Sequence, residues 1–187
     1  MKTVLSVCFG LIAGLTLQAQ SEWVADRAHT SVEFEITHLM ISTVTGKFGE
    51  FAIKATADDA FGTPNFAATI QTASINTDNE RRDNHLRSGD FFEAETYPEI
   101  TFVTTSVAST GEKTFDLNGD LTMRGVTKPV TLKGTVIGVI TDQRSQKLKA
   151  GVRLSTTLNR RDFGVGEKMM MVGDEVEITI RMEMAQQ

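Results

Sequence analysis

Cysteine is almost absent from this chain. The one cysteine among 187 residues stands at position 8, inside an apolar run from Val4 to Leu17 that follows Lys2 and precedes the small residue Ala19. This arrangement predicts a secretory signal peptide over residues 1–19, and its apolar run is shorter than the roughly 20 residues of a membrane-spanning helix. Cleavage would leave 168 residues (187 − 19) without cysteine. Disulfides, thiol nucleophiles and zinc–thiolate sites are then excluded from the mature chain, which must rely on its hydrophobic core.

Basic residues are also in the minority. The sequence has 19 lysines and arginines against 24 aspartates and glutamates. Loss of Lys2 with the leader would leave 18 against 24, a net charge of −6 with the histidines neutral. This balance argues against nucleic acid or an anionic membrane surface as the main partner. We expect a periplasmic or secreted protein with no integral membrane segment in the mature chain.

Long helical patterns are missing, and apolar and polar residues alternate instead. In the stretch from residue 31 to 41, Val32, Phe34 and Ile36 share one parity, and the same alternation returns from 174 to 184. Period two with one apolar face predicts strands that are wet on one side only. We predict eight strands, near residues 31–41, 47–56, 66–75, 99–107, 113–123, 129–140, 146–158 and 174–184.

Short connectors, such as the polar stretch Thr43–Gly46, suit hairpins and therefore an all-β, antiparallel sheet. Eight one-faced strands in up-and-down order can form a sandwich or a closed barrel, and closure removes exposed strand edges. Inward-facing small residues such as Gly119 and Gly134 leave room for a narrow void. The pattern alone leaves open whether such a barrel is fully packed or holds one small ligand.

One stretch, near residues 78–92, interrupts the strands and predicts a short helix. Thr77 and Glu80 have the spacing of a capping box at its start, and Ser88-Gly89 is a suitable end. An insertion between two strands of an up-and-down barrel is expected to lie across one end of that barrel.

The polar residues of this insertion admit three roles. Asp83 and His85 are two residues apart, so they point to different sides of a helix and form no ready acid–base pair. No serine sits in a nucleophile elbow. Three roles are therefore open to the polar side chains Arg82, Asp83, His85 and Arg87. They could anchor the helix to the barrel, contact a polar head group or, as the least favoured role, act in catalysis.

Metal binding has little support in the sequence. The three histidines, His29, His38 and His85, lack the close spacing of a zinc site. Met169, Met170 and Met171 could suggest copper(I), but adjacent methionines more often form adaptable apolar surface. We expect no metal and no cofactor.

Several sequence blocks occur in a recognisable order. The first combines Trp23, Asp26, His29 and His38, and the later ones are "GKFGEF" at 46–51, "RDNHLRSGDFFEAETYPEITF" at 82–102, "LTMRGVTKPV" at 121–130 and "NRRDFGVG" at 159–166. Together these blocks resemble the YceI-like family of periplasmic polyisoprenoid-binding proteins, over Trp23 to about Glu183. One departure is Thr30, where the family usually has serine.

The resemblance implies a lipocalin-like β-barrel over residues 20–187 that binds a long-chain isoprenoid or similar amphiphilic lipid in its hydrophobic interior. It supplies no catalytic residues. The family's marked polar positions, which could be structural, bind a head group, or do both, are carried here by His29, His38, Arg82, Asp83, His85, Arg124, Arg160 and Asp162. A binding protein rather than an enzyme is expected. The alternatives are an enzyme acting on a lipid or quinone-like substrate and a packed-barrel stress or interaction protein.

Two sets of residues are expected to form the ligand site. The cavity wall would contain Phe34, Ile36, Phe51, Ile53, Phe66, Ile70, Phe102, Leu132, Val152 and Ile178. The gate or head-group contacts would come from His38, Arg82, Asp83, His85, Phe91, Phe92, Met169, Met170 and Met171. The ligand's chain length and head group, the pathway and the oligomeric state stay open, with a homodimer as one option.

Overall fold

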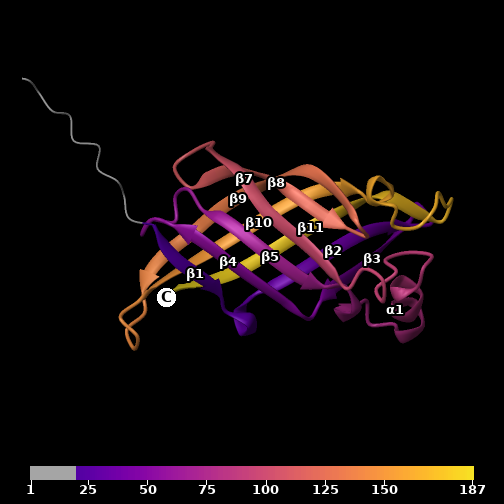
Figure 1. Cartoon of the computed structure of the whole chain (residues 1–187), viewed down its shortest axis with the longest axis horizontal. Helices are drawn as coiled ribbons and strands as arrows, with labels where there is room; N and C mark the ends of the chain where they lie inside the picture. Colours follow the sequence, from indigo (N-terminus) through magenta and orange to yellow (C-terminus); the bar gives the residue numbers. More distant parts are fainter. Residues whose placement is uncertain (1–19) are drawn as a thin grey trace, which may run out of the picture.

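The computed structural model describes residues 20–187, in which eleven strands form one antiparallel sheet that closes on itself (Figure 1). The predicted signal peptide lies outside the described residues. In chain order the strands are β1 (Ser21–Ala25), β2 (Ser31–His38), β3 (Ser42–Phe48), β4 (Phe51–Ala57), β5 (Asn65–Gln71), β6 (Ile75–Asn76), β7 (Glu99–Ser109), β8 (Thr114–Met123), β9 (Val126–Thr141), β10 (Leu148–Asn159) and β11 (Val172–Gln186).

Three long strands of the barrel are interrupted, so each appears as two segments: β1 with β2, β3 with β4, and β5 with β6. Counting each pair once reduces the eleven segments to an eight-stranded barrel (11 − 3). β1 and β2 lie along the same edge of β11, and a 3-10 turn at Arg27–His29 separates them. β3 pairs with β2 and β6, while β4 pairs with β1 and β5. Pairing of Trp23 with Gln186 helps to close the ring. The predicted fold class, an eight-stranded antiparallel barrel with a short helical insertion, is confirmed.

The prediction was wrong at the second strand. The stretch Thr43–Gly46, read as a connector, lies within β3, and β1 was not predicted. Gly46 suggested a turn because glycine is uncommon inside strands. Here the ring of Phe34, its partner on β2, covers the glycine, so the missing side chain leaves no gap in the sheet.

A densely packed core fills the end of the barrel near the C terminus. The rings of Trp23 and Phe61 meet edge to face with centroids 5.0 Å apart, and Phe115, Leu117 and Met184 are fully buried with them. Aromatic rings, rather than voids, occupy the space beside the inward glycines at this end. A Cβ atom at position 134 would come within 2.2 Å of the Phe115 ring.

The helix α1 (Glu80–Arg87) lies at the opposite end of the barrel, between β6 and β7 (Figure 1). Asn79, not the predicted Thr77, caps it by accepting a hydrogen bond from the Arg82 amide at 3.0 Å. The helix ends at Arg87, as expected near Ser88, although Gly89 does not adopt the left-handed conformation. Within residues 20–187, the structure contains no helix with the length and apolar character needed to cross a membrane.

Candidate functional site

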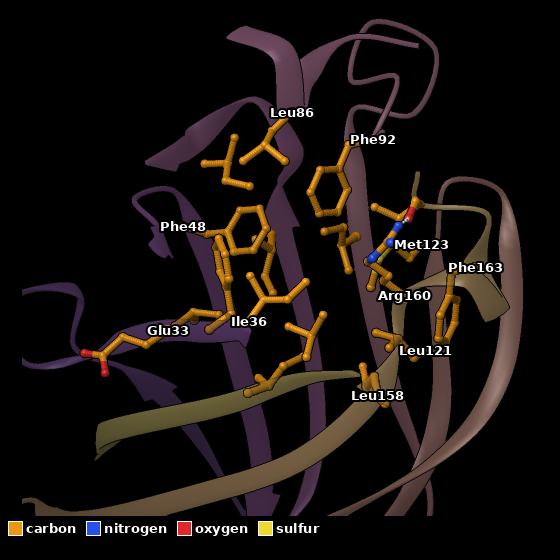
Figure 2. A pocket seen from close by; sticks show the side chains of 18 of the residues that line it. Glu33, Ile36, Phe48, Leu86, Phe92, Leu121, Met123, Leu158, Arg160 and Phe163 are labelled. Carbon is orange, nitrogen blue, oxygen red and sulfur yellow. Dashed lines mark hydrogen bonds between the residues drawn. The ribbon is translucent and has the colours of Figure 1, made fainter. Parts of the chain in front are cut away.

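A cavity of about 410 Å³ occupies the half of the barrel nearest α1. Its wall is almost entirely apolar, and the lining positions of β11 run from Val172 to Met182. At about 3.3 Å per residue, this stretch follows the strand for roughly 30 Å. The cavity is therefore elongated. Glu33 borders it, but its carboxylate points away from the interior (Figure 2).

The two ends of the cavity differ. The packed core around Trp23 and Phe61 closes the inner end. The outer end lies beneath α1 and the segment that follows it, where Phe48 of β3 and Phe92 meet edge to face with centroids 6.1 Å apart (Figure 2). Leu86 of α1 borders the same space. Aromatic and aliphatic side chains thus narrow the end through which a ligand would have to enter.

Eight of the ten residues expected on the wall line the cavity. They are Phe34, Ile36, Ile53, Phe66, Ile70, Phe102, Leu132 and Ile178. Phe51 and Val152 do not line it, so their placement on the wall was wrong. Val152 is buried farther along the barrel, where it pairs with Val136 and Met182. Phe51 begins β4, just after the break in its strand, and packs against the core.

The wall also contains residues that the sequence prediction missed. Val44 was missed because most of β3 was not recognised as a strand. Phe48 lies within the strand predicted at 47–56 but has the opposite parity to Ile53, and the break between β3 and β4 brings both to the cavity. Leu121 and Leu158 lie in predicted strands with the correct alternation, and that signal could have identified both. Met123 ends β8 beside them.

Most of the predicted gate lies around the outer end of the cavity. The residues that border it are His38, Arg82, His85, Phe91, Phe92, Met169 and Met171. Asp83 and Met170 do not: Asp83 is buried in the attachment of α1 to the barrel, and Met170 points into solvent. The structure thus places seven of nine gate residues at one opening and assigns a different environment to the other two.

Asp83 is a structural anchor of the helix. Its carboxylate accepts hydrogen bonds from the Thr77 amide at 2.9 Å and from the Thr77 hydroxyl at 2.5 Å. Arg82 donates to the same hydroxyl at 2.7 Å and to the Thr77 carbonyl at 2.8 Å. Arg87 donates to the carbonyls of Ala73 and Ile75. These contacts fasten α1 to the end of β6.

His85 has a different environment, because its side chain is largely exposed at the rim. Its ring Nε2 lies 3.0 Å from an Asp90 carboxylate oxygen, and its ring meets the Phe91 ring edge to face at 5.0 Å. Asp83 bonds to Thr77 instead of to His85. The two residues considered as an acid–base pair are therefore engaged with separate partners.

Arg160 holds the segment between β10 and β11. Its buried guanidinium donates to the carbonyls of Gly173, Val165 and Glu167 at 2.7–3.0 Å and to the Asp174 carboxylate at 3.2 Å. Burial lowers the pKa of Arg160, and the Asp174 charge opposes that shift. An arginine guanidinium stays cationic at physiological pH even in such surroundings. It fixes the turn that carries Met169–Met171.

A separate polar cluster lies away from the cavity and could be mistaken for a metal site. Asp26, His29 and Glu183 come close enough together to share an ion. However, Lys149 Nζ lies 2.7 Å from Glu183, and His29 Nδ1 lies 3.1 Å from Asp26. The hydrogen bond from His29, together with the Ala28 amide, holds the pKa of the Asp26 carboxyl below its usual range. The cluster is already an ion-pair network.

The chain matches known proteins along most of its length. It is 40% identical over 168 residues to a UPF0312 protein of Pseudomonas putida (strain GB-1), covering 88% of this chain and 87% of that protein. A Campylobacter jejuni YceI protein of known structure superposes with a TM-score of 0.74 at 32% identity, covering 81% and 90% of the two chains.

A second solved structure, described as a polyisoprenoid-binding domain from Saccharophagus degradans implicated in plant cell wall breakdown, superposes with a TM-score of 0.66. It covers 90% of this chain and the whole of that one, and at 15% identity it shows the shared fold alone. The family profile described as the YceI-like domain matches residues 23–184. On this match and that to the Pseudomonas protein, the chain belongs to the YceI-like family.

Proposed function

We propose that this protein is an exported binding protein that sequesters or carries a long-chain isoprenoid or similar amphiphilic lipid in its barrel. The observation that carries the proposal is the elongated apolar cavity of about 410 Å³, closed at one end and bordered by polar groups at the other. This volume lies within the range of roughly 300–1,000 Å³ that is typical of small-molecule sites. One flexible tail fits such a space better than a compact polar substrate.

Energetics favour the same class of ligand. Transfer of apolar surface out of water contributes about 25 cal/mol per Å². A long hydrocarbon chain exposes several hundred Å², so its burial is worth on the order of 10 kcal/mol before the ordering costs of binding. A wall of Phe, Ile, Leu and Val side chains supplies this term without directional contacts.

The polar rim would select the head group. Arg82 uses Nε and Nη2 on Thr77, and among the described residues its Nη1 has no hydrogen-bond partner. His85 and His38 border the same opening. Guanidinium and imidazole donors suit a hydroxyl or phosphate head that accepts hydrogen bonds. The apolar wall and this rim together form the ligand site we propose, with no metal or other cofactor.

The YceI-like family supports a binding role, and the Saccharophagus neighbour is named for polyisoprenoid binding. The enzymatic alternative assigned general acid–base work to Asp83 or His85. Asp83 does not reach the cavity, since its carboxylate is committed to Thr77. His85 borders the cavity, but its Nε2 lies 3.0 Å from an Asp90 carboxylate oxygen at the rim. The packed-barrel alternative conflicts with the cavity itself. We therefore infer binding without turnover.

Native mass spectrometry of the exported chain, beginning at Gln20, tests the proposal. After gentle purification, we expect an adduct that organic solvent removes and that contains a long apolar tail. A preparation freed of this adduct should take up a fluorescent polyene fatty acid added from ethanol. Protein that carries no adduct and takes up no polyene would refute the proposal.

A further inference from the structure

Five exposed apolar side chains gather beside the mouth of the cavity, on two neighbouring loops. They are Leu39, Met40 and Ile41 of the β2–β3 turn and Met170 and Met171 before β11, and they are called the apolar tip below. Met40 and Ile41 are each 87% exposed and Met170 is 98% exposed. The Leu39 amide donates to the Met171 carbonyl at 2.8 Å, so the two loops form one structural unit.

The backbone of the turn indicates that this apolar character is not incidental. Leu39 and Met40 have φ angles of 53° and 60°, in the left-handed region. Glycine and asparagine adopt that region readily, whereas a long apolar side chain there is disfavoured. Strained positions of this kind point to a function for the residue that occupies them. The turn keeps two large apolar side chains in water where glycine or asparagine would fold more easily.

Charge is also absent from the tip. Residues 38–46 and 168–173 contain no aspartate or glutamate, and Lys168 is their one lysine or arginine, in a chain with 24 acidic residues. Negative groups would resist transfer into a lipid interface because a carboxylate is expensive to desolvate. The tip therefore differs from the remaining acidic surface in the property that insertion among lipids requires.

The tip is continuous with the cavity. Met171 is 59% exposed and also borders the cavity, as do His38 and Met169 (Figure 1 shows β2, β3 and the loop before β11 at the end that carries α1). An amphiphile leaving a membrane here would pass from lipid to apolar side chains without crossing water. We infer that the apolar tip inserts into the surface of a lipid bilayer and takes up or delivers the ligand there.

This inference rests on the proposed function, because the class of ligand determines which surface the apolar tip contacts. A long-chain lipid resides in membranes, since its apolar surface is costly to hydrate. A second copy of the chain fits less well, because a stable dimer buries about 20–30 residues on each side. Five side chains fall far short of that number, whereas loop insertion needs only a few. Insertion is driven by the burial of apolar side chains, so the overall negative charge of the protein does not prevent binding to neutral lipids.

Flotation with vesicles of phosphatidylcholine and phosphatidylethanolamine tests the inference. The mature protein should float with the vesicles in low and high salt alike. Met40→Asn with Ile41→Ser should lower the partition coefficient at least about tenfold, the effect of withdrawing a large apolar side chain from lipid. Asparagine suits the left-handed position, so the fold should be retained. The matched control is Ile137→Ser with Ile140→Ser, which removes two exposed side chains of β9 (58% and 65% exposed) and should leave flotation unchanged.

A second measurement gives the depth of insertion. Met40→Trp places an indole on the tip, while Trp23, the one native tryptophan, is fully buried in the packed core. Lipids brominated on their acyl chains should quench the new emission and leave that of Trp23 intact. Equal emission with brominated and ordinary lipids would overturn insertion of Met40.

Polyene uptake separates failure of the tip from failure of the binding function. Tip variants should take up the polyene normally from ethanol in vesicle-free buffer but slowly from loaded vesicles. Wild-type protein that binds the polyene yet does not float would overturn the tip alone. Flotation that depends on the tip, without polyene uptake, would support insertion of the tip and refute the carrier function. A dimer without vesicles that the tip substitutions dissociate would assign the tip to a second copy and overturn the inference.

Discussion

The ring of Phe34 on β2 lies directly over Gly46 on β3, its cross-strand partner. A Cβ atom at position 46 would stand 2.3 Å from Phe34 Cζ, a separation that no packed structure tolerates. The glycine therefore sets the position of the ring, which lines the cavity and lies 5.8 Å from the Phe48 ring between centroids. One backbone position thus helps to shape the mouth of the binding site.

Phe34→Asp should abolish lipid uptake. The substitution places a carboxylate on the apolar wall, where desolvation without a partner is costly, on the order of several kcal/mol. Polyene titration followed by fluorescence measures the loss. Thr37→Asp is the control, because Thr37 lies on the same strand but is exposed, and this variant should bind as the wild type does. Normal uptake by a folded Phe34→Asp protein would remove Phe34 from the proposed site.

Gly46→Ala should narrow the cavity and weaken ligand binding. The added methyl group stands 2.8 Å from Cγ2 of buried Thr77 and 2.3 Å from the Phe34 ring, and the cavity can accept the displaced ring. We expect weaker binding of long or branched chains and a stability change within the roughly 1–3 kcal/mol typical of overpacking. A series of fatty acids of rising length, titrated against both proteins, measures the effect. Equal affinity across the whole series would show that the ring does not limit access.

Gly134→Ala should destabilise the fold without changing ligand affinity, because Phe115 has no free space to enter and does not line the cavity. Its ring is buried in the packed core, 2.2 Å from the position of the new Cβ. We expect a loss of about 1–3 kcal/mol in the free energy of unfolding and unchanged ligand affinity. The control is Gly138→Ala on the same strand, where a Cβ meets nothing within 4 Å. Urea denaturation compares the two, and equal stabilities would contradict this packing account.

Thr77→Val should loosen the helix that covers the cavity. Valine keeps the shape of threonine but removes the hydroxyl that donates to Asp83 and accepts from Arg82. Asp83 keeps its hydrogen bond from the Thr77 amide, but the bond from the hydroxyl and the acceptor of Arg82 Nε are lost. Loss of such hydrogen bonds to charged groups costs about 1–3 kcal/mol, and hydrogen exchange of α1 amides should rise by the corresponding factor. Thr77→Ser, which retains the hydroxyl, should exchange nearly as slowly as the wild type. Unchanged exchange in Thr77→Val would show that the Thr77 hydroxyl does not hold α1 in place.

The barrel was predictable because each strand carries its own alternation, which is a local property of the sequence. β3 escaped prediction because its inward positions, Val44, Gly46 and Phe48, include a glycine whose space is filled by a residue twelve positions earlier. Such compensation between strands is visible only once the register is known. The same reason explains why Gly134, expected to leave a void, is covered by Phe115.

The cavity wall was predictable in large part, since inward parity on a barrel strand means facing the lumen. How far the cavity extends was not, because that depends on where aromatic residues pack: Val152 has the correct parity but lies beyond the inner end. The roles of polar residues were the least predictable. Asp83 was expected at the gate or the head group, yet its carboxylate is bound by Thr77, in the short segment between β6 and the helix.

Arg160→Met should destabilise the protein and mobilise the loop that carries Met169–Met171. Methionine fills the space of the side chain but leaves three carbonyls without their donor and Asp174 with Arg161 alone. Loss of this buried charged group should cost about 3–5 kcal/mol in the free energy of unfolding. Arg161→Ala is the control, because Arg161 is exposed and contributes one ion pair to Asp174, worth about 0–1 kcal/mol.

Urea denaturation measures both variants, and hydrogen exchange localises the effect. Amides of the segment between β10 and β11 should exchange faster in Arg160→Met, while those of β4 and β5 at the far side should change only through the loss of global stability. A uniform change throughout the barrel would mean that Arg160 supports the whole fold. A change confined to this segment, accompanied by faster release of bound polyene, would mean that Arg160 holds the loop at the mouth of the cavity.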